Sequence, residues 1–216
     1  MRGVTFGNKH SYHHWGLMLR SRPVISPPAP KTKYVDVPGA DGALDLTDSL
    51  TGYTQYKNRK ITFDFVIMAG RASWPAIYSD ILDTLHGNVV EIVFDDDPQY
   101  SYKGRVTVGK WDAAKMTATL TMSAEVDPFK TARFSDPEYK NLKVEGSRTV
   151  TLHGMRKPAV PAFTVSSNMQ LTFRGSTYTL TAGENRLPEI VIRHGENTLA
   201  FTGNGTVSID YRGGRF

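Results

Sequence analysis

The segment from Arg59 to Ile67 reads RKITFDFVI, and from Ile61 on every second side chain is apolar, against Thr62, Asp64 and Val66 on the alternate positions. Successive side chains of a β-strand point to opposite faces, so this pattern predicts a strand with one buried and one wet face. The apolar side comprises Ile61, Phe63, Phe65 and Ile67. Such a strand is stable only when the rest of the chain covers those four side chains.

Many other segments have strand character. Residues 89–94, 100–111 and 115–126 predict three strands, with DAAK at 112–115 as a hairpin loop between the last two. After residue 134 the chain consists of short strand-like segments, with turn sequences about every ten residues, a spacing typical of sandwiches and barrels. These segments are 148–154, 161–167, 169–183, 189–203 and 205–214, and the GNG sequence at 203–205 is interpreted as a hairpin turn.

One segment predicts a helix, SWPAIYSDILDTLHG at 73–87. Ser73 is expected to cap it, Pro75 fits its first turn, and Gly87 ends it. Apolar residues recur at three- and four-residue spacing on one side, at Ile77, Ile81, Leu82 and Leu85. The fold class predicted is therefore mainly β, with one convincing helix.

Composition excludes several protein classes. The 216 residues carry a formal charge of +5 and no cysteine, which rules out disulfides and thiolate chemistry. No apolar run approaches the about 20 residues that a membrane span needs, and the first 16 residues do not resemble a secretory signal. The basic excess is spread along the chain, so it indicates solubility more than a nucleic-acid groove.

The polar, proline-bearing segment TARFSDPEYKN at 131–141 marks a domain boundary. We therefore expect two domains, residues 1–133 and residues 134–216. In the first, the proline-rich stretch Arg22–Pro30 is expected to be extended or looping, because proline lacks a backbone donor.

The segment Tyr34–Phe65 contains five aspartates, which raises the question of a cation site. A calcium loop counted from Asp36 fails, since its sixth position is Asp41 and its twelfth is Thr47 instead of Gly and Glu. Pro38-Gly39 and Asp41-Gly42 are turn dipeptides, and Asp45 and Asp48 are expected to satisfy local amides.

Other candidate chemistry is equally incomplete. His10, His13 and His14 lie close together in the sequence, but His10 and His14 would share a face only in a helix, and Gly16 with the aromatic content argues against one. Asp95, Asp96 and Asp97 are consecutive at a strand end and so point in different directions. The turn histidines, His153 and His194, lie beside glycines, and no nucleophile elbow or phosphate loop occurs in the sequence. We expect no catalytic residue, no cofactor and no metal site.

With these residues in view, the chain resembles the distal tail protein (Dit) family of long-tailed, non-contractile phages or prophages of Gram-positive-type hosts. The resemblance rests on GVTFGNKHSYHHWGLML, then on DVPGADGALDLTDSLTGYTQYKNRKITFDF, then on the single helix. It continues through VEIVFDDDPQYSYKGRVTVGKW and VDPF to the closing β segments, so it covers essentially the whole length. The sequence HSYHHW departs from the acidic or polar residues of the family pattern before Trp15.

This resemblance implies a tail-tube-like β domain with one helix at residues 1–133, which would form a ring. It implies a galectin-like β-sandwich at residues 134–216. A Dit protein assembles as a homohexamer between the major tail tube protein and the tail-tip hub or tail-associated lysin protein, around a channel for DNA. The implied location is the virion tail tip, after synthesis in the bacterial cytoplasm and without membrane insertion.

Ordering the turn-rich stretch that precedes the strand Arg59–Ile67 costs conformational entropy. Contact with the surface of a partner must offset that cost. We expect Val24–Leu50 to be an arm that reaches across a neighbouring subunit. The candidate interface residues are Pro38, Gly39, Asp41, Asp45, Asp48, Arg59 and Lys60. In this hypothesis Arg59 and Lys60 meet Asp45 or Asp48 at or beside the contact.

Two other functions stay open at this point. The first is a carbohydrate-binding module for the host cell wall, with the C-terminal sandwich as the binder; the chain has no room for the inserted module of longer Dit relatives. The second is a metal-dependent hydrolase built on the Asp and His clusters. A sugar platform needs an exposed Trp or Tyr, whereas Trp15, Trp74 and Trp111 are expected to serve packing.

Overall fold

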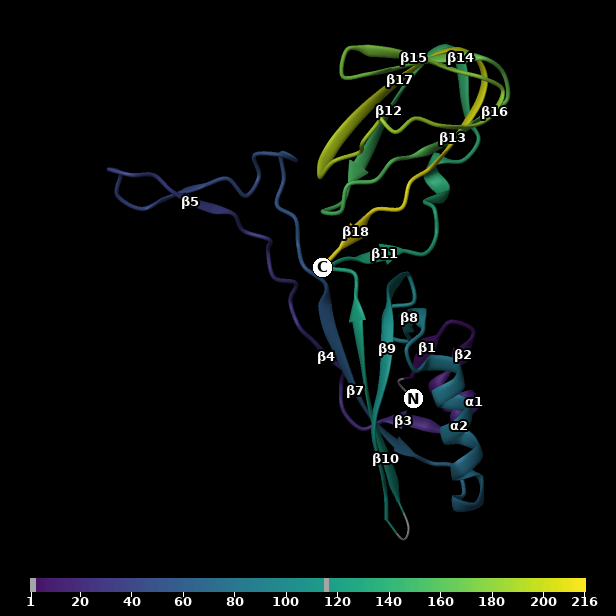
Figure 1. Cartoon of the computed structure of the whole chain (residues 1–216). Coiled ribbons are helices and arrows are strands. Elements are labelled where there is room, and N and C mark those ends of the chain that lie inside the picture. The colour runs from purple at the N-terminus through teal and green to yellow at the C-terminus, as the bar shows by residue number, and fades with distance from the viewer. Residues whose placement is uncertain (1–2, 115–116) are drawn as a thin grey trace. The chain divides into compact units, whose positions relative to one another are not determined.

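The computed structural model describes residues 3–114 and 117–216 and divides into two compact units (Figure 1). Unit 1 contains the chain up to Lys130 together with Phe216, and unit 2 is Thr131–Arg215. Antiparallel strands dominate both units, so the mainly-β class is confirmed. The assignment of a ring-forming and a galectin-like domain stays a prediction. None of the helices in the described ranges has the length and apolar character that a bilayer crossing requires.

Unit 1 is organised around one antiparallel sheet in the order β2-β1-β8-β9-β10-β7-β3, with β4 also paired to β7. Its short strands are β1 (Val4–Phe6), β2 (Lys9–His10), β3 (Leu17–Leu19) and β4 (Val24–Ile25). The longer ones are β7 (Arg59–Ile67), β8 (Val89–Phe94), β9 (Tyr100–Ala113) and β10 (Ala118–Val126). The proline-rich stretch thus supplies only the two-residue strand β4, which agrees with the sequence.

Strand β7 confirms the alternation of its sequence. Ile61, Phe63 and Phe65 are fully buried and Ile67 is nearly so, whereas Lys60 and Thr62 on the other face are exposed. Each apolar side chain of this size contributes about 1.5–3 kcal/mol when fully buried. The alternation of β7 therefore decides which face of the sheet carries the core of unit 1.

The pairing of β9 with β10 contains a bulge that the sequence did not reveal. The register shifts between Met122↔Val108 and Leu120↔Trp111, so β9 has one extra residue there. A bulge reverses the side-chain parity of the strand beyond it. Trp111 consequently turns toward the core and packs on Tyr78 of α2, with ring centroids 4.8 Å apart. The predicted DAAK loop extends to residue 115, which lies outside the described residues.

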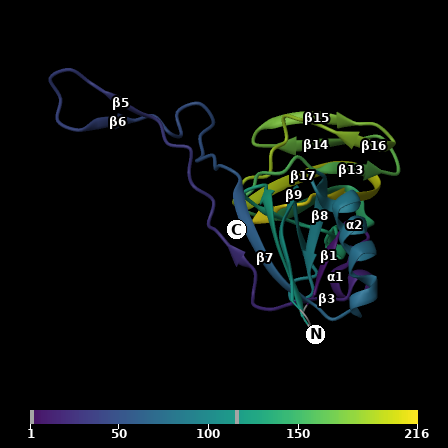
Figure 2. The same cartoon turned by 60° about the horizontal axis from the view of Figure 1, so that its bottom comes forward.

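Helix α2 (Trp74–Leu85) is the one long helix, and it follows the 3-10 turn η1 (Arg71–Ser73). In Figures 1 and 2 it runs beside the sheet of unit 1, with Ile81 and Leu85 fully buried. The Ser73 hydroxyl donates to the Gly70 carbonyl at 2.7 Å and caps no amide of α2, so the predicted cap is wrong. The hydroxyl instead closes the turn that leads into the helix.

The argument against a helix at His10–His14 is also wrong, because Ser11–Trp15 forms the short helix α1. The Nδ1 atom of His10 accepts hydrogen bonds from the amides of Tyr12 (3.1 Å) and His13 (3.3 Å) and so caps this helix. Gly16 adopts φ 65° and ends it in the left-handed conformation. The glycine that counted against the helix is therefore its C-cap.

Unit 2 contains a six-stranded antiparallel sheet in the order β15-β14-β17-β13-β16, with β12 also paired to β17. Its core includes the rings of Phe163 and Phe201, whose centroids lie 6.0 Å apart. The strands are β12 (Leu142–Gly154), β13 (Ala162–Val165), β14 (Met169–Phe173), β15 (Ser176–Leu180), β16 (Gly183–Arg186) and β17 (Gly195–Asp210). Shorter elements are η2 (Pro137–Tyr139), β11 (Lys130–Ala132) and β18 (Gly214–Arg215).

The predicted hairpin turn at Gly203–Gly205 is wrong, because these residues lie inside β17 and pair with β12. Before them β17 pairs with β14, and after them with β13. Gly203 and Gly205 have φ 148° and 146°, which L side chains rarely adopt, and a Cβ on Gly203 would lie 2.8 Å from Met169 Cβ. The two glycines let one strand bend between two partners.

A substitution at Gly104 of β9 tests how closely β9 and β10 pack in the sheet of unit 1. A Cβ atom there would lie 2.2 Å from the carbonyl oxygen of Glu125 and 2.5 Å from Cα of Val126. We expect Gly104→Ala to lower the free energy of unfolding by about 2 kcal/mol or more, measured by urea denaturation. Gly70→Ala is the control, because nothing lies within 4 Å of its Cβ position. Equal stabilities of the two variants would contradict the close approach of β9 to β10.

Candidate functional site

The aspartate- and glycine-rich segment folds into an exposed hairpin that forms its own two-stranded sheet. Strand β5 (Tyr34–Asp36) pairs with β6 (Ala43–Asp45) in the register Tyr34↔Asp45, Val35↔Leu44 and Asp36↔Ala43. The connecting turn has Gly39 at φ 83° and Gly42 at φ 75°. The prediction that Pro38-Gly39 and Asp41-Gly42 are turn dipeptides is therefore confirmed.

The hairpin has an apolar face and an acidic face. Val35 and Leu44 are directly opposite each other and so lie on the same face, and they are 38% and 53% exposed. Their neighbours along the strands, Asp36 and Asp45, point to the other face. Cross-strand apolar pairs stabilise a sheet most when another surface covers them, and here they face solvent.

Exposed large apolar side chains are concentrated in and around this hairpin. The segment 24–53 holds Val24, Ile25, Tyr34, Val35, Val37, Leu44, Leu50 and Tyr53, and it holds most of those in the described chain. Leu50 is 97% exposed. A gathering of this kind marks an interaction surface, and an isolated two-stranded hairpin is at best marginally stable in water.

The aspartates of the hairpin make local contacts only. Asp45 Oδ1 accepts a hydrogen bond from the Thr47 amide at 2.9 Å, and bonds to Thr47 hold the pKa of this carboxyl below its usual value. At Asp48 it is the backbone carbonyl that is engaged, by the amide of Gly52. In residues 3–114 and 117–216, no group of three His, Asp or Glu side chains is placed to hold a metal ion.

The stem of the hairpin is closed by backbone bonds and by aromatic packing. Pro30 and Tyr56 form an isolated β-bridge between the two sides of the stem. The ring of Tyr56 meets Phe129 at 5.8 Å and Phe216 at 4.8 Å, and the latter two stack at 4.9 Å. This aromatic cluster, Tyr56–Phe129–Phe216, anchors the stem in unit 1.

Arg59 and Lys60 lie on opposite faces of β7. Arg59 is 6% exposed, with its guanidinium 4.8 Å from the ring centre of Tyr102, and burial lowers its pKa. Its Nε and Nη2 atoms have no hydrogen-bond partner among the described residues. Lys60 is on the exposed face, opposite Glu125 of β10. Within the described chain neither residue forms an ion pair with Asp45 or Asp48, and the contact between subunits stays a prediction.

The exposed face of the unit 1 sheet is polar and nearly balanced in charge. Arg105, Glu125 and Lys60 are directly opposite one another on β9, β10 and β7, so the charges alternate across the sheet. The next row along the strands is Thr107, Ser123 and Thr62. Short hydroxyl side chains therefore lie beside alternating charges on this part of the face, where Arg105 and Glu125 also line a hollow together with Val89.

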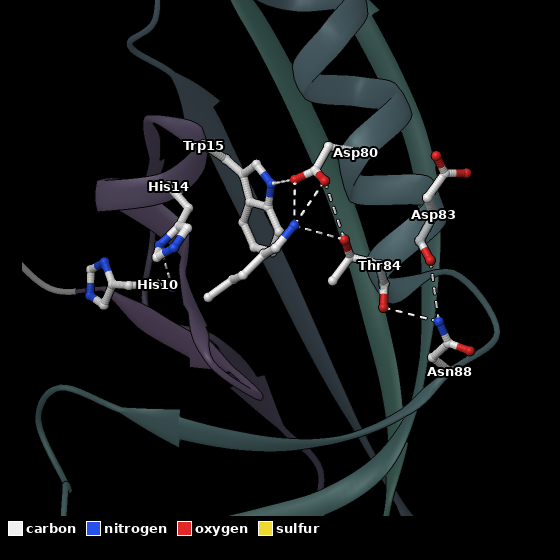
Figure 3. A network of polar contacts seen from close by, with 8 residues as sticks. His10, His14, Trp15, Asp80, Asp83, Thr84 and Asn88 are labelled. Carbon is white, nitrogen blue, oxygen red and sulfur yellow. Dashed lines mark hydrogen bonds and ion pairs between the residues drawn. The ribbon is translucent and has the colours of Figure 1, made fainter.

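A polar network that the sequence did not reveal fastens α1 to α2 (Figure 3). Asp80 of α2 accepts hydrogen bonds from Lys9 Nζ at 2.8 and 2.9 Å and from the indole N–H of Trp15 at 2.6 Å. Lys9 also donates to the Thr84 hydroxyl at 3.1 Å. These bonds from Lys9 and Trp15 hold the pKa of Asp80 below its usual value.

The histidines and the aspartate triplet are parts of the same structural region. His10 Nε2 lies 3.2 Å from both carboxylate oxygens of Asp95, whose Oδ2 also accepts the Gly3 amide at 2.7 Å. His14 Nδ1 accepts the His10 amide at 3.2 Å (Figure 3). Asp97 turns away to pair with Lys130 at 2.5 Å. These side chains position backbone, and the aspartates diverge as the sequence indicated.

Unit 2 lacks a stacking platform for sugars. Its only exposed large apolar residue among those described is Phe134, and Tyr178 and Tyr211 pack against the core. The three tryptophans all belong to unit 1, where Trp15 and Trp74 are buried and Trp111 packs on α2. Nothing in the described part of unit 2 therefore favours carbohydrate binding.

Comparison with solved structures gives an informative likeness. The fold matches the crystal structure of SPP1 Dit, which is described as a paradigm of the hub adsorption apparatus in phages that infect Gram-positive bacteria. The TM-score is 0.64, the sequence identity is 12%, and the match covers 100% of both chains. No family model and no curated protein sequence matches the chain. The chain thus has a Dit-like fold over its whole length.

The lowered pKa of Asp80 predicts how the stability of the protein depends on pH. The pKa of this carboxyl is lowered on folding, so its contribution to stability is complete above the unfolded value of about 3.9 and is lost as pH falls through the lower folded value. We expect Asp80→Asn to lower stability at pH 7 by about 1 kcal/mol, because the carboxylate is half exposed. Thermal melts between pH 7 and pH 2 measure this loss, which should shrink at the acidic end. Asp83→Asn on the same helix is the control and should leave the melts unchanged.

Proposed function

We propose that this chain is a structural protein of a phage tail tip, a distal tail protein of the Dit kind. The observation that carries the proposal is the match in fold to SPP1 Dit over the full length of both chains. Matches of fold alone do not fix function, so the surfaces of the molecule must support it as well. The protein acts without catalysis, as a joint between larger parts of a tail.

The assembly we propose is a closed ring of six copies, formed by unit 1. The exposed hairpin supports this, because its apolar face gains stability only when another surface covers it. A copy of the same chain can provide that surface in a head-to-tail contact, and such contacts close into a ring when the rotation fits. The hairpin residues Pro38, Gly39, Asp41, Asp45 and Asp48 belong to this contact.

The exposed face of the unit 1 sheet is suited to line the channel of the ring. A strongly cationic lining would hold DNA by releasing its counterions, and each phosphate contact would add to the affinity. Alternating charges at Arg105, Glu125 and Lys60, with hydroxyl side chains beside them, offer little net attraction. DNA then passes without sequence-specific binding.

In this role the ring joins the major tail tube protein to the tail-tip hub or tail-associated lysin protein. The protein is made in the bacterial cytoplasm and becomes part of the virion. No specific observation favours the carbohydrate-binding alternative, since the described part of unit 2 presents no exposed Trp or Tyr.

The mass of the purified protein in solution tests the ring. We expect a particle of about six times the chain mass of 24.0 kDa, measured by light scattering and native mass spectrometry. The mass should fall toward that of one chain on dilution, because the contact is between separate copies. A protein that is monomeric at every concentration would contradict the proposal.

Removal of the hairpin tests its role in the contact. We expect replacement of residues 34–50 by a short Gly-Ser linker to give a folded monomer, because β5 and β6 pair only with each other. Circular dichroism and thermal melts verify that the sheet of unit 1 survives. A linker of equal composition replacing residues 174–175, at the turn of the β14–β15 hairpin, is the control and should leave the oligomer intact. An unchanged oligomer without residues 34–50 would show that the hairpin is dispensable.

A further inference from the structure

Charge is segregated along the chain on either side of Tyr34. Residues 20–33 contain four basic residues, Arg20, Arg22, Lys31 and Lys33, and no acidic residue. Residues 34–56 contain four acidic residues, Asp36, Asp41, Asp45 and Asp48, and no basic residue. The hairpin and the segment that leads into it are therefore complementary in charge.

The basic segment also carries apolar surface that is fixed to the sheet. Strand β4 pairs with β7 through Val24↔Thr62 and Ile25↔Ile61, and no other described strand pairs with it on its outer side. Val24 is 65% exposed and Ile25 is 38% exposed. An edge strand with exposed apolar side chains is a surface on which another chain can dock.

A cavity of about 510 Å³ opens beside β4. Its apolar wall includes Leu19, Ile25, Phe94 and Tyr102, and Arg20 and Arg22 belong to its lining. The carboxylate of Asp97 in the same lining is paired with Lys130. Asp96 also belongs to the lining, so the cavity combines an apolar wall with cationic side chains from the basic segment and with two aspartates on its other side.

The cations of this segment are largely uncommitted. Arg20 lies 3.8 Å from Asp64, which is a loose contact between exposed side chains. Among the described residues, Arg22, Lys31 and Lys33 have no acidic partner. An acidic group brought to this segment would not have to displace an existing strong ion pair.

The hairpin of the same chain is poorly placed to reach this surface. Ser26–Pro30 reads SPPAP, and proline-rich sequence adopts an extended, semi-rigid conformation of about 3.1 Å per residue. The Pro30–Tyr56 bridge then closes the stem immediately after this spacer. A stiff spacer between acceptor and hairpin opposes folding back, so a second copy is the better partner.

We infer that the acidic hairpin of one copy docks on residues 19–25 and the adjoining cavity of a second copy. The apolar face with Val35 and Leu44 covers Val24 and Ile25, and the aspartates meet Arg20 and Arg22. This inference deepens the proposed function and rests on it, since it names the acceptor of the contact that closes the ring. Added salt weakens the contact, because its charges are exposed.

Charge reversal tests the pairing. The acceptor variant is Arg20→Glu with Arg22→Glu, because both side chains line the cavity, and the hairpin variant is Asp36→Lys with Asp41→Lys. Each variant alone should raise the concentration of half-dissociation at least tenfold, measured by light scattering and native mass spectrometry. An equal mixture of the two should assemble again, because alternating copies bring wild-type charges to one contact and reversed charges to the next.

Lys140→Glu with Lys143→Glu in unit 2 is the control, with the same change of net charge as the acceptor variant, and it should assemble like the wild type. Circular dichroism verifies that every variant is folded. If the wild type assembles and both reversals assemble equally well, or if the mixture stays dissociated, the acceptor is wrong while the ring stands. A wild type that never assembles overturns the acceptor and the proposed function together.

Discussion

The two-residue period of β7 is the constraint on which unit 1 depends. One face of this strand buries Ile61, Phe63 and Phe65, and the opposite face carries the polar side chains of Lys60, Thr62 and Asp64. A shift of one residue in register would exchange the two faces and expose the core. Both the packing of α2 on one face and the polar side chains on the other depend on this single register.

The hairpin β5–β6 differs from the sheet of unit 1, because it has no buried core of its own. Its strands pair only with each other, and its apolar pair Val35 and Leu44 remains exposed. Its local bonds, such as that from the Thr47 amide to Asp45, shape the turn without adding a core. We propose that assembly completes this segment, and the Dit-like fold and the exposed hairpin both support that proposal.

The spacing of apolar residues in strands and helices, together with the residues typical of turns, made much of the fold predictable from sequence. The alternation at Ile61–Ile67, the helix at residues 74–85 and the turn glycines Gly39 and Gly42 all depend on neighbours in the chain. The Asp45 turn is predictable for the same reason. Local sequence carries enough information wherever the stabilising contact spans only a few residues.

The features that sequence missed depend on long-range contacts or on unusual caps. The bulge opposite Thr121 is decided by the partner strand, and the network at Asp80 joins residues 65 positions apart. The helix at Ser11–Trp15 is capped by a histidine ring, which is not a preferred capping group. Gly203 and Gly205 look like a turn locally, and only the change of partner along β17 shows that they bend a strand.

The aromatic cluster Tyr56–Phe129–Phe216 has a consequence for synthesis. The chain leaves unit 1 after Lys130, builds all of unit 2, and returns to unit 1 only at Phe216. On the ribosome, the stem of the hairpin therefore lacks its third ring until the whole of unit 2 has been translated. The three-ring cluster that anchors the hairpin stem therefore forms only after the residues of unit 2 have been translated.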